Sequence, residues 1–196
     1  PISLGYPTKY GFGGAALSPA PWLIMTHRCL LVQFLQRGEL KTLMFNPTDD
    51  VAARKTPFFE RTIRQFGDYI AFNLLAKRFD SLEHQLAALG VTRESVDYVA
   101  FDHFHTQDFR GLLGTQDAAH APRFPNAKLL AQRAEWDDWD DLHPLQRAWY
   151  VADGKATVRT NQVVLLDGDF ELGDGVMLLR TPGHTSGNQT LFVNTP

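Results

Sequence analysis

Two short apolar segments that run directly into histidines constrain this chain more than any other feature. Residues 96–101 have the pattern of a buried strand, and His103 and His105 follow almost immediately. Residues 176–179 have a second strand pattern, which leads through Thr181-Pro182-Gly183 to His184. Histidine is the commonest metal ligand among side chains. We therefore expect a fold built on β-sheet in which polar ligand-type residues appear where strands end.

Apolar runs bounded by turn residues predict the remaining strands. We expect these over residues 22–27, 29–36, 40–45, 127–131 and 163–166. Arg37 and Gly38 form a tight turn between the second and third of them. An acidic aromatic segment covers residues 135–141. The order of strands, helices, a strand and then more strands shows no internal repeat and no clear boundary between domains.

The spacing of apolar and capping residues predicts three helices between residues 56 and 90. Thr56 is a suitable N-cap with Pro57 at the first helical position, and this helix extends to Phe66. Residues 68–79 have the pattern of a second helix. Asp80 with Glu83 resembles a capping box for a third, which ends before a glycine at position 90.

The composition is that of one globular domain of ordinary size. Hydrophobic residues make up 44% and charged residues 21% of the 196 residues. The net charge is −3, and Lys and Arg are scattered along the chain, so a nucleic-acid partner is not favoured. The single cysteine, Cys29, lies in an apolar run and is expected to be a buried free thiol. Gly11-Phe12-Gly13-Gly14 lacks the ending of a phosphate-binding loop and is expected to be a flexible loop.

No membrane segment is expected from the sequence. The longest apolar stretches are shorter than the roughly 20 residues that cross a bilayer, and the N-terminal region lacks the basic and apolar segments of a signal peptide. These features favour a cytoplasmic protein without a membrane partner.

His103, His105 and His184 are candidate ligands of one metal ion. On an extended segment, residues two apart project from the same side, with Cβ atoms roughly 7 Å apart. Both imidazoles can then reach one ion at about 2.0–2.1 Å. His184 would supply the third nitrogen, because Pro182 and Gly183 let the backbone turn before it. A three-histidine site leaves a coordination position for water, which is the arrangement that a catalytic zinc ion needs.

The same segments resemble the motifs of the metallo-β-lactamase-fold hydrolases. Residues 99–108, Val-Ala-Phe-Asp-His-Phe-His-Thr-Gln-Asp, resemble the family's His-x-His-x-Asp-His motif, and residues 181–187, Thr-Pro-Gly-His-Thr-Ser-Gly, closely resemble its second metal-binding loop. Residues 124–128 with Glu135-Trp136, and residues 166–175, are similar to the segments between and before these motifs. The resemblance covers residues 22–196 and implies a four-layer αββα sandwich, an α/β fold.

The chain departs from the family pattern at two neighbouring positions. Gln107 stands where the family has an aspartate ligand of a second metal, and Asp108 stands where it has a histidine. A neutral amide is a weak ligand compared with a carboxylate. We expect Asp108 to be a catalytic residue or a metal ligand: it can bind a second, harder ion such as Mn²⁺ or Fe²⁺, or act as general base. The alternative is that Asp108 is the N-cap of a helix beginning near Phe109.

The resemblance also implies ligands that follow the second loop, whereas the sequence ends at Pro196. We expect the chain to cover the N-terminal two thirds of the family domain. Residues 1–21 are expected to be an N-terminal arm or loop, and residues 22–196 the metallo-β-lactamase-like domain. Two roles for the arm are compatible with the sequence: contact within a homodimer, or a lid over the pocket.

Taken together, the motifs predict a metal-dependent hydrolase. A metal-bound hydroxide would attack an ester, lactone, thioester or amide of a small-molecule substrate. The cofactor is expected to be zinc, with manganese or iron as alternatives, as one or two ions. Two other functions stay open: a catalytically degenerate member of the fold that binds a metabolite or a partner protein, and a redox protein.

Other conspicuous residues are given ordinary roles. His120 is expected to be a solvated loop residue, and His27, His84 and His143 have no partners at ligand spacing. Four aromatic residues are expected to fill the core, with an acyl pocket as the alternative, namely Trp136, Trp139, Trp149 and Tyr150.

Overall fold

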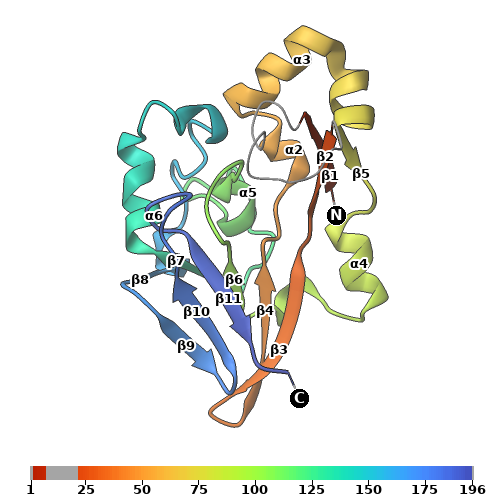
Figure 1. Ribbon diagram of the computed structural model, residues 1–196. Coiled ribbons are helices and arrows are strands. Elements are labelled where there is room, and N and C mark those ends of the chain that lie inside the picture. The colour runs from red at the N-terminus through yellow and green to blue at the C-terminus, as the bar shows by residue number, and fades with distance from the viewer. Residues whose placement is uncertain (1, 8–21, 196) are drawn as a thin grey trace.

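The computed structural model describes residues 2–7 and 22–195, and β-strands form its framework (Figure 1). The strands are β1 (Ile2–Pro7), β2 (Trp22–His27), β3 (Leu30–Gln36), β4 (Glu39–Phe45), β5 (Ala76–Arg78), β6 (Tyr98–Ala100), β7 (Lys128–Gln132), β8 (Val163–Leu166), β9 (Phe170–Gly173), β10 (Val176–Arg180) and β11 (Gln189–Val193). Every strand predicted from the sequence is present. The sequence did not predict β1, β5, β9 and β11. The expected loop at Gly11–Gly14 lies outside the described residues.

The central sheet has five strands in the order β3-β4-β6-β7-β8. Strands β3 and β4 are antiparallel and joined by the predicted tight turn, in which Arg37 (φ 53°) and Gly38 (φ 83°) both have positive φ. Strands β4, β6, β7 and β8 run parallel to one another. Because parallel strands end at the same edge, the loops after β4, β6 and β7 meet there.

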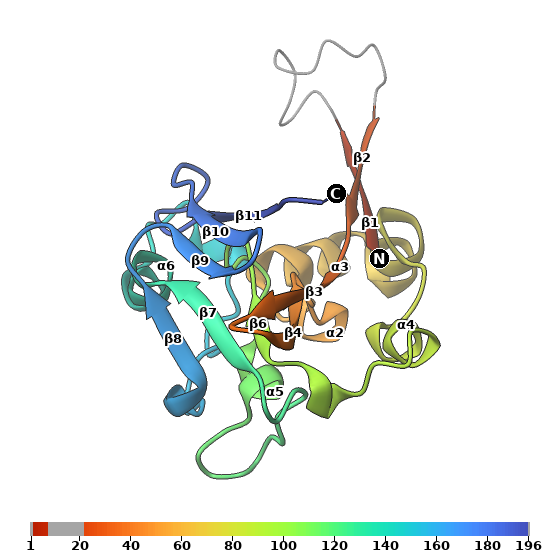
Figure 2. The same cartoon turned by 90° about the horizontal axis from the view of Figure 1, so that it is seen from below.

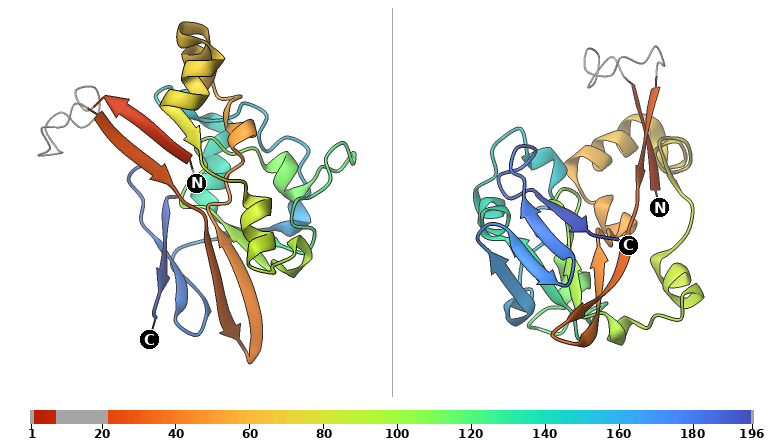
Figure 3. Two further views of the ribbon diagram at one scale, coloured as in Figure 1. Left: turned by 90° about the vertical axis from the view of Figure 1, so that its right-hand side faces the viewer. Right: turned by 60° about the horizontal axis from the view of Figure 1, so that its bottom comes forward.

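Two smaller sheets accompany the central one. Strands β11-β10-β9 form an antiparallel sheet that faces the central sheet (Figure 2). Strands β2-β1-β5 form the other, which stands beside α3 and apart from β9–β11 (Figure 3). The loop that follows β10 reaches the same edge as the loop that follows β6, because Gln189 N donates to Asp102 O at 2.8 Å.

Short helices and helical turns complete the structure. They are α2 (Asp50–Ala53), α3 (Pro57–Ile70), a π-helical turn (Ala71–Leu75), α4 (Leu82–Ala88), α5 (Phe109–Leu113), α6 (Arg133–Asp138) and 3₁₀ turns at Arg93–Ser95, Trp139–Asp141, Arg147–Trp149 and Thr160–Gln162. As predicted, Thr56 caps α3 and Pro57 opens it. Gly67 has φ 79°, which kinks α3 where the sequence predicted its end.

Two helix predictions are wrong in detail. Residues 68–79 do not form one helix, because the chain leaves α3 at Ile70, makes a π-helical turn and ends in β5, which pairs with β1. Pairing with a distant strand overrides the local helical pattern. The N-cap of α4 is Ser81, whose side chain accepts from His84 N, and not Asp80. Gly90 does follow this helix with φ 67°, as predicted.

Alternating side chains of the central strands enter two separate cores. Leu43, Ala100 and Leu130 point toward the small sheet and pack against residues such as Leu178. The neighbours of these residues along each strand point the other way. They pack against the helices in a second core that includes Met44, Val99, Leu129, Leu86, Phe109, Leu112 and Trp139. A strand buried on both faces needs a continuous apolar run, which explains why these strands were recognisable in the sequence.

The layers of the described residues are therefore helices, the five-stranded sheet and the three-stranded sheet β9–β11. This arrangement agrees with three layers of the predicted αββα sandwich. Cys29 is half-buried and not fully buried as expected, and burial raises the pKa of its thiol to about 12. Among residues 2–7 and 22–195, no helix combines the length and apolar character needed to cross a membrane.

The core between the two sheets gives a first prediction. Leu178 has 0% exposure, so Leu178→Ala should lower the free energy of unfolding by about 2–5 kcal/mol through lost burial and a residual cavity. Leu40→Ala makes the same change at a residue that is 62% exposed. It should alter the free energy of unfolding by less than about 0.5 kcal/mol. Urea unfolding followed by circular dichroism measures both. Equal losses would contradict the assignment of this core.

Candidate metal centre

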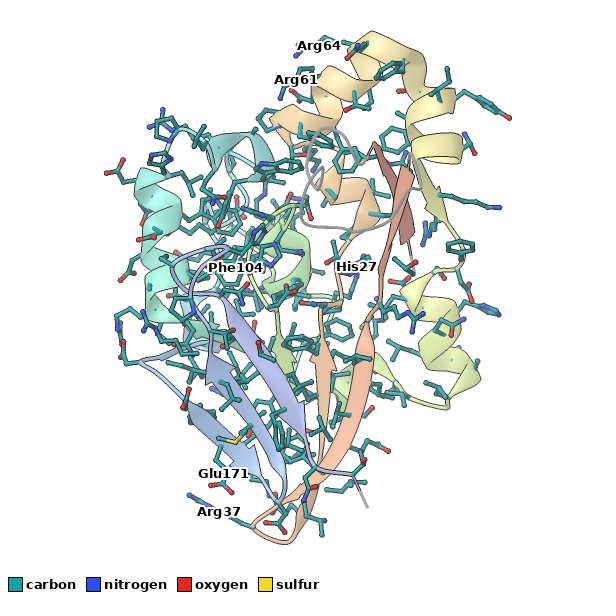
Figure 4. The ribbon with its side chains drawn as sticks, in the orientation of Figure 1. His27, Arg37, Arg61, Arg64, Phe104 and Glu171 are labelled. Carbon is teal, nitrogen blue, oxygen red and sulfur yellow. The ribbon has the colours of Figure 1, made fainter. Side chains whose placement is uncertain are left out.

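The three predicted histidines meet at the edge where β6 and β10 end. His103 and His105 lie in the loop that follows β6, and His184 lies in the loop that follows β10. Figure 4 labels Phe104, the residue between the first two, at this end of the sheets. His103 and His105 do not continue the strand as expected, because their segment is irregular and turns at Thr106, which has φ 66°. The turn still brings both rings to one place.

The three rings surround a common point. Ring centroids are separated by 4.6 Å for His103 and His105, 4.6 Å for His103 and His184, and 4.8 Å for His105 and His184. The planes of the rings are nearly perpendicular, at 90°, 90° and 80°. One nitrogen from each ring lies within 4.8 Å of the others. The arrangement is that of a compact three-nitrogen cluster.

Two observations show that these rings fit a metal ion. His105 Nδ1 and His184 Nε2 are 3.2 Å apart. Two nitrogens that each lie about 2.05 Å from a tetrahedral ion would be about 3.3 Å apart. In addition, His103 Nδ1 is buried without a well-formed hydrogen bond. Imidazole nitrogens are suitable ligands for zinc, iron and other transition metals, so the donor set matches the chemistry expected from the sequence.

The environment of the cluster favours neutral imidazoles. Burial, together with the neighbouring His103, lowers the pKa of His105 to about 4. Burial and the same neighbour also lower the pKa of His184. A metal ligand must be unprotonated. At neutral pH these two rings are therefore already in the form that binds an ion.

His103 is accompanied by a carboxylate. Asp102 Oδ1 accepts from His103 N at 2.8 Å and lies 3.0 Å from His103 Nδ1, although the latter contact lacks hydrogen-bond geometry. Burial opposes ionisation of Asp102, but the neighbouring His103, through its backbone N–H and its ring, outweighs it, so the pKa of Asp102 is lowered. Asn46, at the end of β4, holds this residue by accepting from Asp102 N at 2.9 Å.

A buried carboxylate ties the two histidine loops together. Glu135 is 2% exposed and lies in α6. Its Oε1 accepts from Phe104 N at 2.8 Å and from the Tyr150 hydroxyl at 3.0 Å, and its Oε2 accepts from Gly187 N at 3.2 Å. A Cβ at Gly187 would collide with the backbone and Cβ of Glu135, so this close approach requires glycine. No role for Glu135 was predicted from the sequence.

Gln107 and Asp108 turn away from the histidine cluster. Gln107 is buried, and its amide donates to Thr48 Oγ1 at 2.9 Å and to His105 O at 3.1 Å. Asp108 caps α5 by accepting from Arg110 N at 3.1 Å, which is the alternative that the sequence had left open. The Arg110 guanidinium binds both carboxylate oxygens of Asp108 at 2.9 and 2.7 Å.

A further cation faces the same carboxylate. Lys55 Nζ lies 3.5 Å from Asp108 Oδ2. Burial would raise the pKa of Asp108, but the hydrogen bonds and charge of Arg110 outweigh it and lower this pKa. These contacts do not favour the predicted roles of Asp108 as metal ligand or general base.

A cavity of about 330 Å³ opens beside the cluster. Its lining combines polar and apolar side chains, namely Asp138, Leu142, His143, Leu145, Gln146, Tyr150, His184, Thr185 and Ser186, together with Gly183. The volume falls within the range of small-molecule sites. A larger cavity of about 970 Å³ lies between α4 and the start of β3, and none of the three clustered histidines lines it.

Most of the other residues considered in the sequence analysis lie where they were expected, in the core or at the surface. Trp139 and Tyr150 are buried in the core, and Trp136 and Trp149 pack against it, although Tyr150 also reaches the cavity. His120 is exposed. His143 lines the cavity, which its isolated position in the sequence did not indicate. Gln146 was also missed, because nothing in the sequence relates it to the histidines.

Comparisons with known proteins agree with this architecture. No family model matches the sequence. A crystal structure of a quorum-quenching N-acyl homoserine lactone lactonase superimposes with a TM-score of 0.61 at 20% identity, over 97% of this chain and 64% of that one. A probable metal-dependent hydrolase from Staphylococcus aureus has a TM-score of 0.56 at 20% identity, over 80% and 50%. The chain thus has the fold of these hydrolases, which agrees with the metallo-β-lactamase-like fold that its motifs predicted.

Several sequence relatives are N-acyl homoserine lactonases. An N-acyl homoserine lactonase from Bacillus thuringiensis is 28% identical over 131 residues, which are 66% of this chain and 46% of the relative. The enzyme of the same name from Bacillus cereus is 31% identical over 111 residues, or 56% and 38%. An N-acyl homoserine lactonase from Rhizobium radiobacter is 30% identical over 122 residues, or 57% and 41%. The chain spans less than half the length of these relatives.

The Glu135 contacts give a second prediction. Glu135→Gln should lower the free energy of unfolding by about 1–3 kcal/mol, because an amide NH₂ would replace the oxygen that accepts from Gly187 N. The matched control is Glu171→Gln, an exposed residue at the far end of the sheets from Phe104 (Figure 4), which should change stability by less than about 0.5 kcal/mol. Urea unfolding measures the free energy of unfolding of both variants. Equal effects would show that Glu135 does not hold the loops.

The buried ion pair gives a third prediction. Asp108→Asn should cost about 1–3 kcal/mol at pH 7, because Arg110 loses a charged acceptor at a carboxylate whose side chain is 6% exposed. Asp167→Asn breaks a similar but exposed pair with Arg133, and should cost less than about 1 kcal/mol.

The cost of Asp108→Asn should depend on pH. The folded pKa of Asp108 is lowered, so its stabilisation is complete above the ordinary pKa of about 3.9 and is lost as pH falls through the lower folded value. Urea unfolding at pH 7 and at pH 3 should therefore show a smaller difference between wild type and variant at the lower pH. A difference that is independent of pH would contradict the assignment.

Proposed function

We propose that the protein is a metal-dependent hydrolase that opens a lactone or a related ester. The observation that carries the proposal is the three-histidine cluster, in which His105 Nδ1 and His184 Nε2 stand 3.2 Å apart beside a cavity of about 330 Å³. Such a pair of nitrogens has the separation that ligands of one tetrahedral ion require.

In this proposal His103, His105 and His184 hold the ion, with zinc as the first candidate and manganese or iron as alternatives. A bound ion of this kind polarises a carbonyl oxygen and brings the pKa of a water ligand toward about 7. Other residues of the chain position the three histidines. Glu135 holds the backbone of both histidine loops, and burial keeps the imidazoles of His105 and His184 neutral.

We propose a single ion. The residues at the positions of the second-metal ligands are already engaged: the Gln107 amide donates to Thr48 and to the His105 carbonyl, and Asp108 is paired with Arg110 and Lys55. A carboxylate with two cations beside it has little affinity left for a third. Asp108 would then stabilise the start of α5 and leave the chemistry to the histidine cluster.

The proposed substrate is a lactone with an acyl chain. Sequence relatives from Bacillus thuringiensis and Bacillus cereus are named N-acyl homoserine lactonases, and a solved structure of such a lactonase superimposes on 97% of this chain. The cavity suits a small molecule of mixed character, since Leu142 and Leu145 give it an apolar side, and Asp138 and Ser186 a polar one. Water reaches the cluster through the same opening, because His184 is exposed.

A second function is favoured by one observation. The engagement of Gln107 and Asp108 removes the ligands of a second metal site, so a fold that retains its shape without hydrolytic activity would bind a metabolite or a partner protein instead. Metal content and ring opening separate the two functions.

The test compares the wild-type full chain with His105→Ala and Asp108→Ala. Metal analysis after zinc loading and dialysis should give one ion per chain for wild type and for Asp108→Ala, and none for His105→Ala. Opening of an N-acyl homoserine lactone is measured through the acid that it releases. The rate should depend on zinc in wild type, be retained in Asp108→Ala and fall to background in His105→Ala.

Other outcomes would replace the proposal. Two ions in wild type that fall to one in Asp108→Ala would show that Asp108 binds a second metal. One ion without ring opening of lactones or simple esters would favour the metabolite-binding alternative. No stoichiometric ion in wild type would exclude the metal centre.

A further inference from the structure

One side chain outside both metal-binding motifs contacts two of the three clustered histidines. Gln146 lies in the turn before the 3₁₀ segment Arg147–Trp149 and is half-buried. Its Oε1 is 2.5 Å from His105 Nε2, and its Nε2 donates to His184 O at 3.1 Å. A single amide therefore spans the loop that follows β6 and the loop that follows β10.

The chemistry of the amide fixes its orientation. The carbonyl oxygen of His184 can only accept a hydrogen bond, so the NH₂ group of Gln146 must face it. The amide oxygen then faces His105, and because this oxygen can only accept, His105 Nε2 must carry the hydrogen. A neutral imidazole with hydrogen on Nε2 has a free lone pair on Nδ1. Nδ1 is the atom that stands 3.2 Å from His184 Nε2.

The turn that carries Gln146 is itself held by hydrogen bonds. Gln146 N donates to His143 O at 2.8 Å, and Trp149 N donates to Gln146 O at 3.0 Å. Thr106 N donates to Trp149 O at 2.7 Å, which joins this turn to the residue that follows His105. The amide thus approaches His105 from a segment whose backbone is anchored to the same loop.

We propose that Gln146 is a positioning residue of the metal centre: it selects the His105 tautomer that presents Nδ1 to the ion, and it holds the His184 loop at the distance that one ion requires. The inference rests on the proposed function for the ion itself, but the tautomer of His105 is a property of the metal-free chain. Removing such an outer partner of a ligating histidine typically costs about 10–100-fold in metal affinity.

The experiment uses the full chain with Gln146→Leu, Gln146→Glu and the control Gln162→Leu. Leucine has a similar length and neither accepts nor donates. Glutamate keeps an acceptor for His105 Nε2 but cannot donate to His184 O. Gln162 donates to Pro125 O at 2.8 Å, and none of the three clustered histidines is its partner, so Gln162→Leu controls for loss of an amide elsewhere.

Two quantities are measured, neither of which is catalytic activity. The first is the tautomer of His105 in metal-free protein at pH 8, read from the ¹⁵N chemical shifts of its ring by NMR. The second is the affinity for Zn²⁺, read by competition with a chromophoric chelator. Wild type, Gln162→Leu and Gln146→Glu should keep hydrogen on Nε2, and Gln146→Leu should show a mixture of tautomers. Zinc affinity should fall about 10–100-fold in Gln146→Leu and be unchanged in Gln162→Leu.

The outcomes separate this inference from the proposed function. A Gln146→Leu variant that folds, keeps hydrogen on Nε2 and binds zinc as wild type does would overturn the role of Gln146. A Gln146→Glu variant with the mixed tautomers of the leucine variant would overturn it as well. If wild type binds no zinc but its tautomer depends on Gln146 as described, the proposed function fails and the tautomer assignment stands.

Discussion

The buried carboxylate of Glu135 is the interaction on which the arrangement of the site depends. It accepts hydrogen bonds from Phe104 N, Gly187 N and the Tyr150 hydroxyl, so one helix holds the loops after β6 and β10 at a fixed separation. A buried charge is tolerated only where donors surround it, and three donors meet that condition here. This anchor therefore supports the placement of His105 and His184, whose nitrogens are 3.2 Å apart.

Charge is distributed differently on the two sides of the loop that follows β6. The cations Arg110 and Lys55 neutralise Asp108, and the Gln107 amide is engaged with Thr48. The histidine rings face one carboxylate at Asp102 and a neutral amide at Gln146. His105 and His184 are therefore unprotonated at neutral pH, and within residues 2–7 and 22–195 no Lys or Arg has a hydrogen bond or ion pair to a ring of the cluster. That contrast is the physical basis for proposing one ion instead of two.

Most of the central strands and the three clustered histidines were predictable from the sequence, for identifiable reasons. Strands buried on both faces need continuous apolar runs, and the loop Thr181-Pro182-Gly183-His184 has an unusual composition. The segment 68–79 was predicted incorrectly, because its pairing with β1 depends on residues more than 60 positions away. The cap of α4 was misplaced by one residue, since neighbouring Asp80 and Ser81 both have side chains that suit an N-cap.

The sequence by itself determined the kinds of donor and their order along the chain: two histidines after one strand, a third after another, and no carboxylate at position 107. The tertiary structure decided which of these donors face one point, which carboxylate caps a helix, and which side chains support the rings. Glu135 and Gln146 lie 30 and 41 positions from His105. Their roles arise from hydrogen bonds whose distances and directions exist only after the sheets have packed, and no local pattern of residues encodes such geometry.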